Sequence, residues 1–174
     1  MTDRPKYPVP DPWYIVESST LEEFVLGMLP LGHLLETSVV GVFEDKGRGS
    51  RRDIELPLHR DGQYSKKLAE AQGGSVVEFP NIDIVGLHCI REGSEQCFTT
   101  LLVAEGYVPE ADGPGGLMTG NIECIELRRG QSLVFDNNRC LHGRSGTVGE
   151  RLVVRMWLRN DILRGVIPPQ PQVP

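Results

Sequence analysis

The sequence predicts a mostly β domain, built as an antiparallel sandwich or barrel, on three observations. The chain has 174 residues, the usual size of one domain, so a single domain over residues 1–174 is expected. Twenty glycines and thirteen prolines are typical of a chain with many turns rather than of a helical bundle. The third observation is a series of short runs rich in β-branched residues, separated by clusters of Gly, Pro, Asn and Asp. These runs cover residues 37–43, 54–58, 82–90, 98–104, 122–128, 132–135 and 151–158.

One short helix is expected before these strands. Thr20 is a typical N-cap, acidic residues occupy the next turn, and apolar residues recur at helical spacing before Pro30, which predicts a helix over 20–28. Prolines gather at both ends of the chain. We therefore expect a core over about 37–160, with an extended N-terminal arm over 1–15 and a C-terminal tail over 166–174.

Composition disfavours several functional classes. The net charge of -6 makes nucleic acid an unlikely partner. No apolar run approaches the roughly 18 residues that span a bilayer, and the first residues carry no apolar signal-peptide core, so a cytoplasmic protein without a membrane segment is expected. The four cysteines form no C-x-x-C pair, which predicts reduced, mostly buried thiols rather than a zinc knuckle or a disulfide framework.

Two histidines stand beside other reactive groups. His59 follows a strand run, and an extended backbone would place its side chain on the same face as that of Asp61. His142 follows a second strand run, in turn-like surroundings. Two imidazoles and one carboxylate form the facial triad that suits non-haem iron(II) oxygenases, because three coordination positions stay open.

Two arginines in the last strand run predict an anion site. Arg155 stands in the middle of an apolar run, where a buried guanidinium is costly unless an anion pairs with it. Arg151 lies four residues earlier, hence on the same face of a strand, so the pair could hold both ends of a small dicarboxylate. A structural salt bridge to an internal Asp or Glu is the alternative.

Three stretches resemble, in the same order, motifs of the iron(II)- and 2-oxoglutarate-dependent oxygenases. They are HRDGQY at 59–64, FDNNRCLHGR at 135–144 and RLVVRMWL at 151–158. The resemblance is to the group that contains taurine dioxygenase and γ-butyrobetaine hydroxylase. It implies a double-stranded β-helix, a relative of the jelly roll and the cupins, with one or two short helices.

The resemblance also implies roles for particular residues. His59, Asp61 and His142 would bind the iron. Arg155 would bind the C5 carboxylate of 2-oxoglutarate and Arg151 would lie near its C1 end. The family also uses a threonine for the cosubstrate, for which Thr99 is the nearest counterpart.

The implied reaction is hydroxylation of a C–H bond of a small, polar or anionic metabolite. Dioxygen and 2-oxoglutarate would be consumed, and succinate and carbon dioxide released. Tyr64 could face this substrate, or pack on the rim of the barrel. The segment 104–120, with five glycines, is long enough to act as a lid, and the basic loop 46–52 is compatible with an anionic substrate. The short interval between Asp61 and His142 leaves room for a partner subunit, so a homo-oligomer is possible.

Two other functions remain open. One is a jelly-roll sensor or binding protein that keeps the metal site but has no turnover. The other is a cupin-type metalloenzyme that uses the triad without 2-oxoglutarate. Formation of succinate without substrate would exclude the pure binding protein, and an Arg155→Ala variant with unchanged activity would favour the cupin-type enzyme.

Overall fold

The computed structural model describes residues 7–40, 56–62, 82–92, 98–104, 120–145 and 151–160, and these residues form nine strands and two short helices. The strands are β1 (Trp13–Glu17), β2 (His33–Val40), β3 (Leu56–His59), β4 (Ile84–Arg91), β5 (Phe98–Ala104), β6 (Gly120–Ile125), β7 (Gln131–Asp136), β8 (Cys140–Ser145) and β9 (Leu152–Arg159). The helices are α1 (Leu21–Met28) and the single 3-10 turn η1 (Leu29–Leu31).

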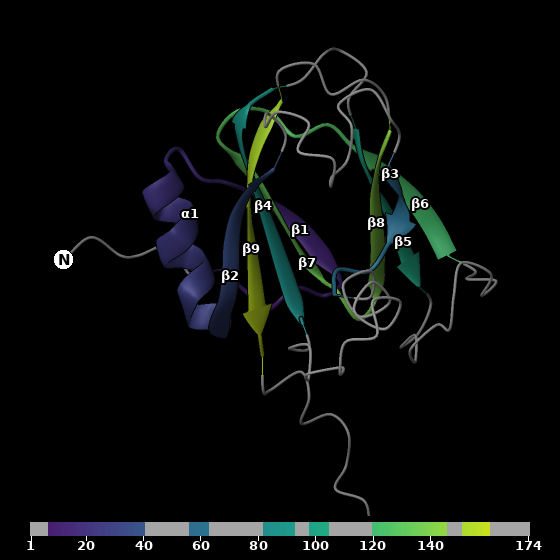
Figure 1. Cartoon of the computed structure of the whole chain (residues 1–174), viewed down its shortest axis with the longest axis horizontal. Coiled ribbons are helices and arrows are strands. Elements are labelled where there is room, and N and C mark those ends of the chain that lie inside the picture. The colour runs from purple at the N-terminus through teal and green to yellow at the C-terminus, as the bar shows by residue number, and fades with distance from the viewer. Residues whose placement is uncertain are drawn as a thin grey trace, which may run out of the picture.

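The strands form two antiparallel sheets that face each other (Figure 1). One sheet has the order β1-β7-β4-β9-β2 and the other the order β3-β8-β5-β6. Helix α1 lies on the outer side of the five-stranded sheet. The mostly β class and the antiparallel pairing predicted from the sequence are confirmed.

An apolar core fills the space between the sheets, and a second one lies under α1. Strand β9 contributes to both cores because its side chains alternate between its two faces. Val153 belongs to the inner core, together with Leu101 of β5 and Phe135 of β7. Met156 belongs to the outer core under α1. By the same alternation Arg155 and Trp157 point between the sheets, where the candidate site lies.

The predicted helix over 20–28 is confirmed as α1. Thr20 is its N-cap: the Thr20 hydroxyl accepts a hydrogen bond from the Glu23 backbone N–H, and the Glu23 carboxylate accepts one from the Thr20 N–H. The helix comes so close to β4 that a Cβ on Gly86 would lie 2.5 Å from the Met28 methyl carbon. A glycine in β4 therefore lets α1 cover the sheet.

Two strands were not predicted from the sequence, and β2 begins at His33 instead of residue 37. Strand β1 begins within the predicted N-terminal arm, directly after Pro12, and it pairs with β7 at the edge of the larger sheet. Tyr7, also in that arm, is buried under α1, so this part of the arm packs against the domain. Strand β8 lies where turn-like surroundings were predicted for His142. Its sequence CLHGRS lacks β-branched residues, and pairing with both β3 and β5 makes it a strand.

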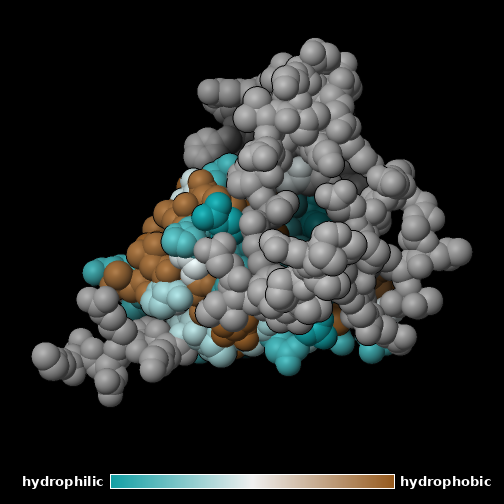
Figure 2. All heavy atoms as spheres, turned by 90° about the horizontal axis from the view of Figure 1, so that it is seen from below, coloured by the Kyte–Doolittle hydropathy of each residue, from teal (hydrophilic) through white to brown (hydrophobic). Residues whose placement is uncertain are grey.

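Some apolar side chains reach the surface on the side of α1 and β2, on the left of Figure 2. Leu26 of α1 and Leu34 and Val39 of β2 are exposed there. None of the helices in the described ranges is long and apolar enough to cross a membrane. The predicted C-terminal tail over 166–174 lies outside the described residues.

Candidate metal centre

Two histidines meet across neighbouring strands of the smaller sheet. His59 is the last residue of β3, and its register partner is His142 of β8. The two ring centroids are 4.4 Å apart. The His142 ring is buried and also contacts Phe135 of the opposite sheet, with 5.0 Å between centroids. The pairing of β3 with β8 thus brings both imidazoles to one place between the sheets.

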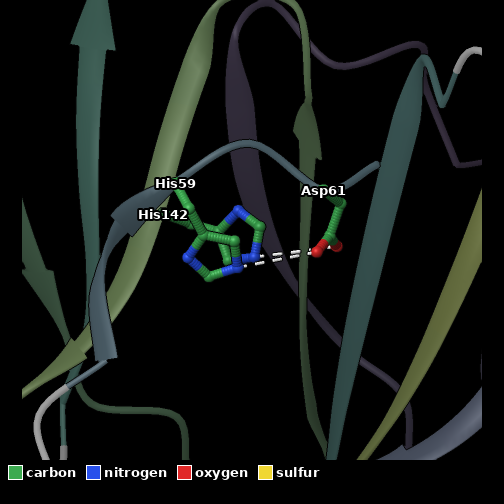
Figure 3. Close-up of side chains that lie close together, drawn as sticks. All are labelled: His59, Asp61 and His142. Atoms are coloured by element: carbon green, nitrogen blue, oxygen red, sulfur yellow. Dashed lines mark ion pairs between the residues drawn. The ribbon is translucent and has the colours of Figure 1, made fainter. Parts of the chain in front are cut away.

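Asp61 brings a carboxylate to the two imidazoles (Figure 3). Its Oδ1 lies 3.6 Å from Nε2 of His59, and its Oδ2 lies 3.6 Å from Nε2 of His142. One ligand atom from each of the three residues lies within 4.8 Å of the others. Strand β3 ends at His59, and Asp61 lies in the turn that follows, which continues through Gly62 with a φ of 90°.

The backbone of Asp61 is held by Asn137, in the turn between β7 and β8. The Asn137 side chain accepts a hydrogen bond from the Asp61 N–H and donates one to the Asp61 carbonyl, both at 3.2 Å. It also donates to the carbonyl of Ile82 at 2.9 Å. Asn137 is buried, so both polar ends of its amide are used inside the protein. The turn that leads to His142 therefore fixes the position of Asp61.

Two side chains of β9 contact the Asp61 carboxylate from the opposite sheet. The indole Nε1–H of Trp157 donates to Oδ2 at 2.6 Å, and Nη1 of Arg155 donates to Oδ1 at 3.4 Å. The Arg155 guanidinium carbon lies 4.1 Å from the centroid of the Trp157 ring. Nη2 of Arg155 is 3.7 Å from a carboxylate oxygen of Glu36, which is half exposed. The anion predicted beside Arg155 is thus present, and the chain's own acids supply it.

These contacts set the protonation states of the buried ligands. Burial raises the pKa of Asp61, but it is outweighed by the hydrogen bond from His59, the positive charges of His142 and Arg155 and the hydrogen bond from Trp157. Together they lower the pKa to about 2. Burial lowers the pKa of His142 to about 4, although the Asp61 carboxylate favours the protonated form. At neutral pH Asp61 is therefore an anion and His142 is neutral.

The three residues fit a divalent transition metal. Metal binding needs a deprotonated carboxylate and neutral imidazoles, which is the state that burial and neighbouring charges favour for Asp61 and His142. With metal–ligand bonds of about 2.1 Å, adjacent ligand atoms lie about 3 Å apart. The two observed distances of 3.6 Å involve different oxygens of Asp61, and one ligand atom from each of the three residues lies within 4.8 Å of the others, so the side chains would have to move closer together around a bound metal. A set of two nitrogens and one oxygen leaves coordination positions open for small molecules.

Arg151 and Thr99, both predicted to contact the cosubstrate, meet each other in the structure. Nη2 of Arg151 donates a hydrogen bond to the Thr99 hydroxyl at 2.7 Å. Both residues are buried, and they face the space between the sheets because each lies two residues before an inner-core residue, Val153 and Leu101 respectively, and so shares its face of the strand. The structure thus brings six of the seven predicted site residues into two contacting groups around β9, one centred on Asp61 and one on Thr99.

Other sequence predictions lie partly or wholly outside the described residues. These are Tyr64, the basic loop 46–52 and, apart from its two ends, the segment 104–120. Of the described cysteines, Cys89 and Cys140 are buried and Cys124 is exposed, and none of the three forms a disulfide. Burial raises the pKa of Cys140 to about 12, so this thiol is protonated at neutral pH.

Sequence reasoning missed two contacts of Asp61. Trp157 packs on the inner core, and its indole N–H also binds the Asp61 carboxylate. Asn137 lies in the turn before β8 and binds the backbone of Asp61. The alternation of β9 could have placed Trp157 on the face of Arg155. The contact itself joins residues 96 positions apart, which no local pattern reveals.

The chain was compared with protein-family models and with curated proteins. Neither comparison gives a match. The candidate site is therefore argued from its own geometry.

Proposed function

We propose that the protein is a non-haem iron(II)- and 2-oxoglutarate-dependent dioxygenase that hydroxylates a C–H bond of a small polar or anionic metabolite. The observation that carries this proposal is the convergence of His59, Asp61 and His142 within 4.8 Å, between two β-sheets and beside an arginine. The donor set is the one typical of iron(II) sites that activate dioxygen.

The nesting of the strands supports a double-stranded β-helix. Among the eight strands β2 to β9, the first pairs with the last, the second with the seventh, the third with the sixth and the fourth with the fifth. This is the pattern of a long hairpin wound into a roll, which is how jelly rolls are built. The nesting also accounts for the meeting of residues 59–61 with residue 142.

The site residues have distinct tasks. His59, Asp61 and His142 would hold the iron by one side of its coordination sphere. The bound metal supplies the oxidising chemistry, in which dioxygen and 2-oxoglutarate are converted to succinate and carbon dioxide while a substrate C–H becomes C–OH. The inner core around the site limits access of water to the reacting groups.

The contacts favour a different order of the two arginines from the one that the resemblance implies. Arg155 touches Asp61 and so would lie beside a bound metal, where the C1 end of the cosubstrate or an anionic substrate would bind. Arg151 binds Thr99. In the pairing of β5 with β8, Thr99 lies opposite Arg144. Arg144 is two residues further along β8 than His142, which corresponds to about 7 Å along the strand. That offset is comparable to the length of a five-carbon dicarboxylate, so we assign the C5 carboxylate to Arg151 and Thr99.

Turnover of the cosubstrate tests the proposal. The protein would be incubated in air with iron(II), ascorbate and ¹³C-labelled 2-oxoglutarate, and labelled succinate would be measured by NMR. We expect succinate from the native protein, even without substrate, and at least tenfold less from His142→Ala and Arg151→Ala, because one loses a metal ligand and the other a charge-assisted bond to the cosubstrate. Arg91→Ala, at the exposed end of β4, is the control that should keep activity. Succinate formation that survives His142→Ala would contradict the proposal.

A second candidate is a cupin-type metalloenzyme that does not use 2-oxoglutarate. The observation that favours it is that Arg155 is already engaged by Asp61 and Glu36, as in a structural salt bridge. This enzyme would bind a divalent metal at the triad but would form no succinate. The two functions therefore give opposite results in the same assay.

A further inference from the structure

Trp157 makes the shortest contact to the candidate metal ligand Asp61. Its indole N–H donates to Oδ2 at 2.6 Å, whereas the Arg155 contact to Oδ1 is 3.4 Å long. A hydrogen bond to a charged carboxylate at the shorter distance is strong, and the longer one is weak. The two oxygens of Asp61 are thus held unequally.

The orientation of the indole is itself fixed. Trp157 is part-buried and packs on the inner core, and the Arg155 guanidinium covers its ring at 4.1 Å. An indole nitrogen is a donor only, with no acceptor function. In the hydrogen bond between them, Trp157 is therefore always the donor and Asp61 the acceptor.

We propose that Trp157 is a positioning residue that holds Oδ2 of Asp61 and presents Oδ1 to the metal. With Oδ2 bound to the indole, Asp61 would offer a metal one oxygen instead of two, which would leave more coordination positions for other ligands. Groups behind a metal ligand commonly orient it in this way, and their loss weakens metal affinity 10- to 100-fold as a rule. This inference rests on the metal site of the proposed function, and it is independent of 2-oxoglutarate.

The variant Trp157→Phe tests the role, because it keeps an aromatic ring and removes only the donor and part of the ring. Cobalt(II) is the probe, since its visible absorption reports the geometry of its ligands. We expect the Kd for cobalt(II) to rise about tenfold and the visible bands to change in shape. Trp13→Phe is the matched control: Trp13 packs on the same inner core but belongs to β1, away from Asp61. It should leave both the Kd and the bands unchanged.

A second measurement uses the native protein and does not depend on the folding of a variant. The chain has two tryptophans, so a ¹⁵N-labelled sample gives two indole N–H signals, and Trp13→Phe assigns them. We expect the Trp157 indole proton to exchange slowly with water and its signal to shift when zinc(II) is added, because the metal draws charge from Asp61. The proposal is overturned if this proton exchanges as fast as a free indole, or if zinc(II) leaves its signal in place while it binds.

The outcomes separate this inference from the proposed function. If cobalt(II) binds with native affinity to both Trp157→Phe and His142→Ala, the metal site itself is wrong and both proposals fail. If His142→Ala abolishes binding and Trp157→Phe leaves Kd and spectrum unchanged, only the positioning role fails. If Trp157→Phe behaves as expected but no succinate forms in any assay, the positioning role stands and the 2-oxoglutarate function fails.

Discussion

Asp61 is a carboxylate buried between two sheets, and its neighbours determine whether such a charge is tolerated. An ionised carboxylate without partners is strongly disfavoured inside a protein. Here Arg155 and Trp157 approach it from one sheet and the two histidines from the other. The carboxylate therefore stays charged and is ready to bind a metal without first losing a proton.

The same groups make the metal-free protein sensitive to acid. The pKa of His142 is about 4 in the folded state, against an ordinary value of 6.5 in the unfolded state. Its contribution to the free energy of unfolding is therefore complete above pH 6.5 and is lost as the pH falls through 4. Asp61, with a pKa of about 2 against an ordinary 3.8, adds a contribution that is lost between pH 4 and 2. In the presence of a chelator, we expect protonation of His142 alone to lower the free energy of unfolding, measured in urea, by about 3 kcal/mol between pH 6.5 and 4.

The control for this prediction is His142→Gln, which cannot take up a proton in this range. Other groups also titrate on acidification, among them Asp136, whose pKa is raised mainly by burial. The native protein and the variant share those groups, so the difference between their two pH profiles isolates His142. Parallel profiles between pH 6.5 and 4 would contradict the assigned protonation states.

At the scale of elements, the turn between β7 and β8 joins the two halves of the site. Asn137 in this turn holds the backbone of Asp61 on both its N–H and its carbonyl. Its own N–H donates to the carbonyl of Asp83, the residue before β4. The turn thereby ties the end of β3 to the start of β4 and leads directly into the strand that carries His142.

Removal of the Asn137 amide should affect the metal site as well as the fold. We expect Asn137→Ala to lower the free energy of unfolding by about 1–3 kcal/mol, because buried backbone groups lose their partners. We also expect it to weaken cobalt(II) binding about tenfold, because Asp61 is no longer fixed. Both quantities can be measured by urea unfolding without metal and by titration of the folded protein.

Asn160→Ala is the matched control for this prediction. Asn160 is also a buried amide that donates to a backbone carbonyl, that of Leu31, but the described contacts of its side chain do not include Asp61. It should lose comparable stability and keep native metal affinity. If both variants weaken cobalt(II) binding equally, Asn137 acts only through general stability.

The strands and the helix differ in how far the sequence alone predicts them. Helix α1 carries a local signal, the capping box at Thr20, and the predicted range agrees with the structure. Inner strands such as β4 carry a continuous apolar run because both of their faces are covered. Strand β1 has strand-forming residues, WYIVE, but it is a short edge strand inside the proline-rich N-terminal segment. Strand β8 lacks β-branched residues and depends on its neighbours.

At the scale of the whole molecule, the nested pairing of β2 to β9 assembles the site from distant segments. The types of the ligands could be predicted, because His59, Asp61 and His142 stand in distinctive local motifs. The residues that hold Asp61 in place could not be predicted, because Asn137 and Trp157 are 76 and 96 positions away from it in the chain. Local patterns therefore predict which groups can bind a metal, and only the three-dimensional pairing shows what holds them.

Binding of iron(II) together with 2-oxoglutarate at the triad can be tested by an anaerobic titration of the protein with both, followed by visible absorption. Chelated 2-oxoglutarate is expected to give a weak charge-transfer band near about 500 nm, which is a property of the metal complex. We expect this band in the native protein and its loss in His142→Ala and Arg151→Ala. Iron(II) that binds without producing the band would rule out the proposed dioxygenase and favour the metalloenzyme that does not use 2-oxoglutarate.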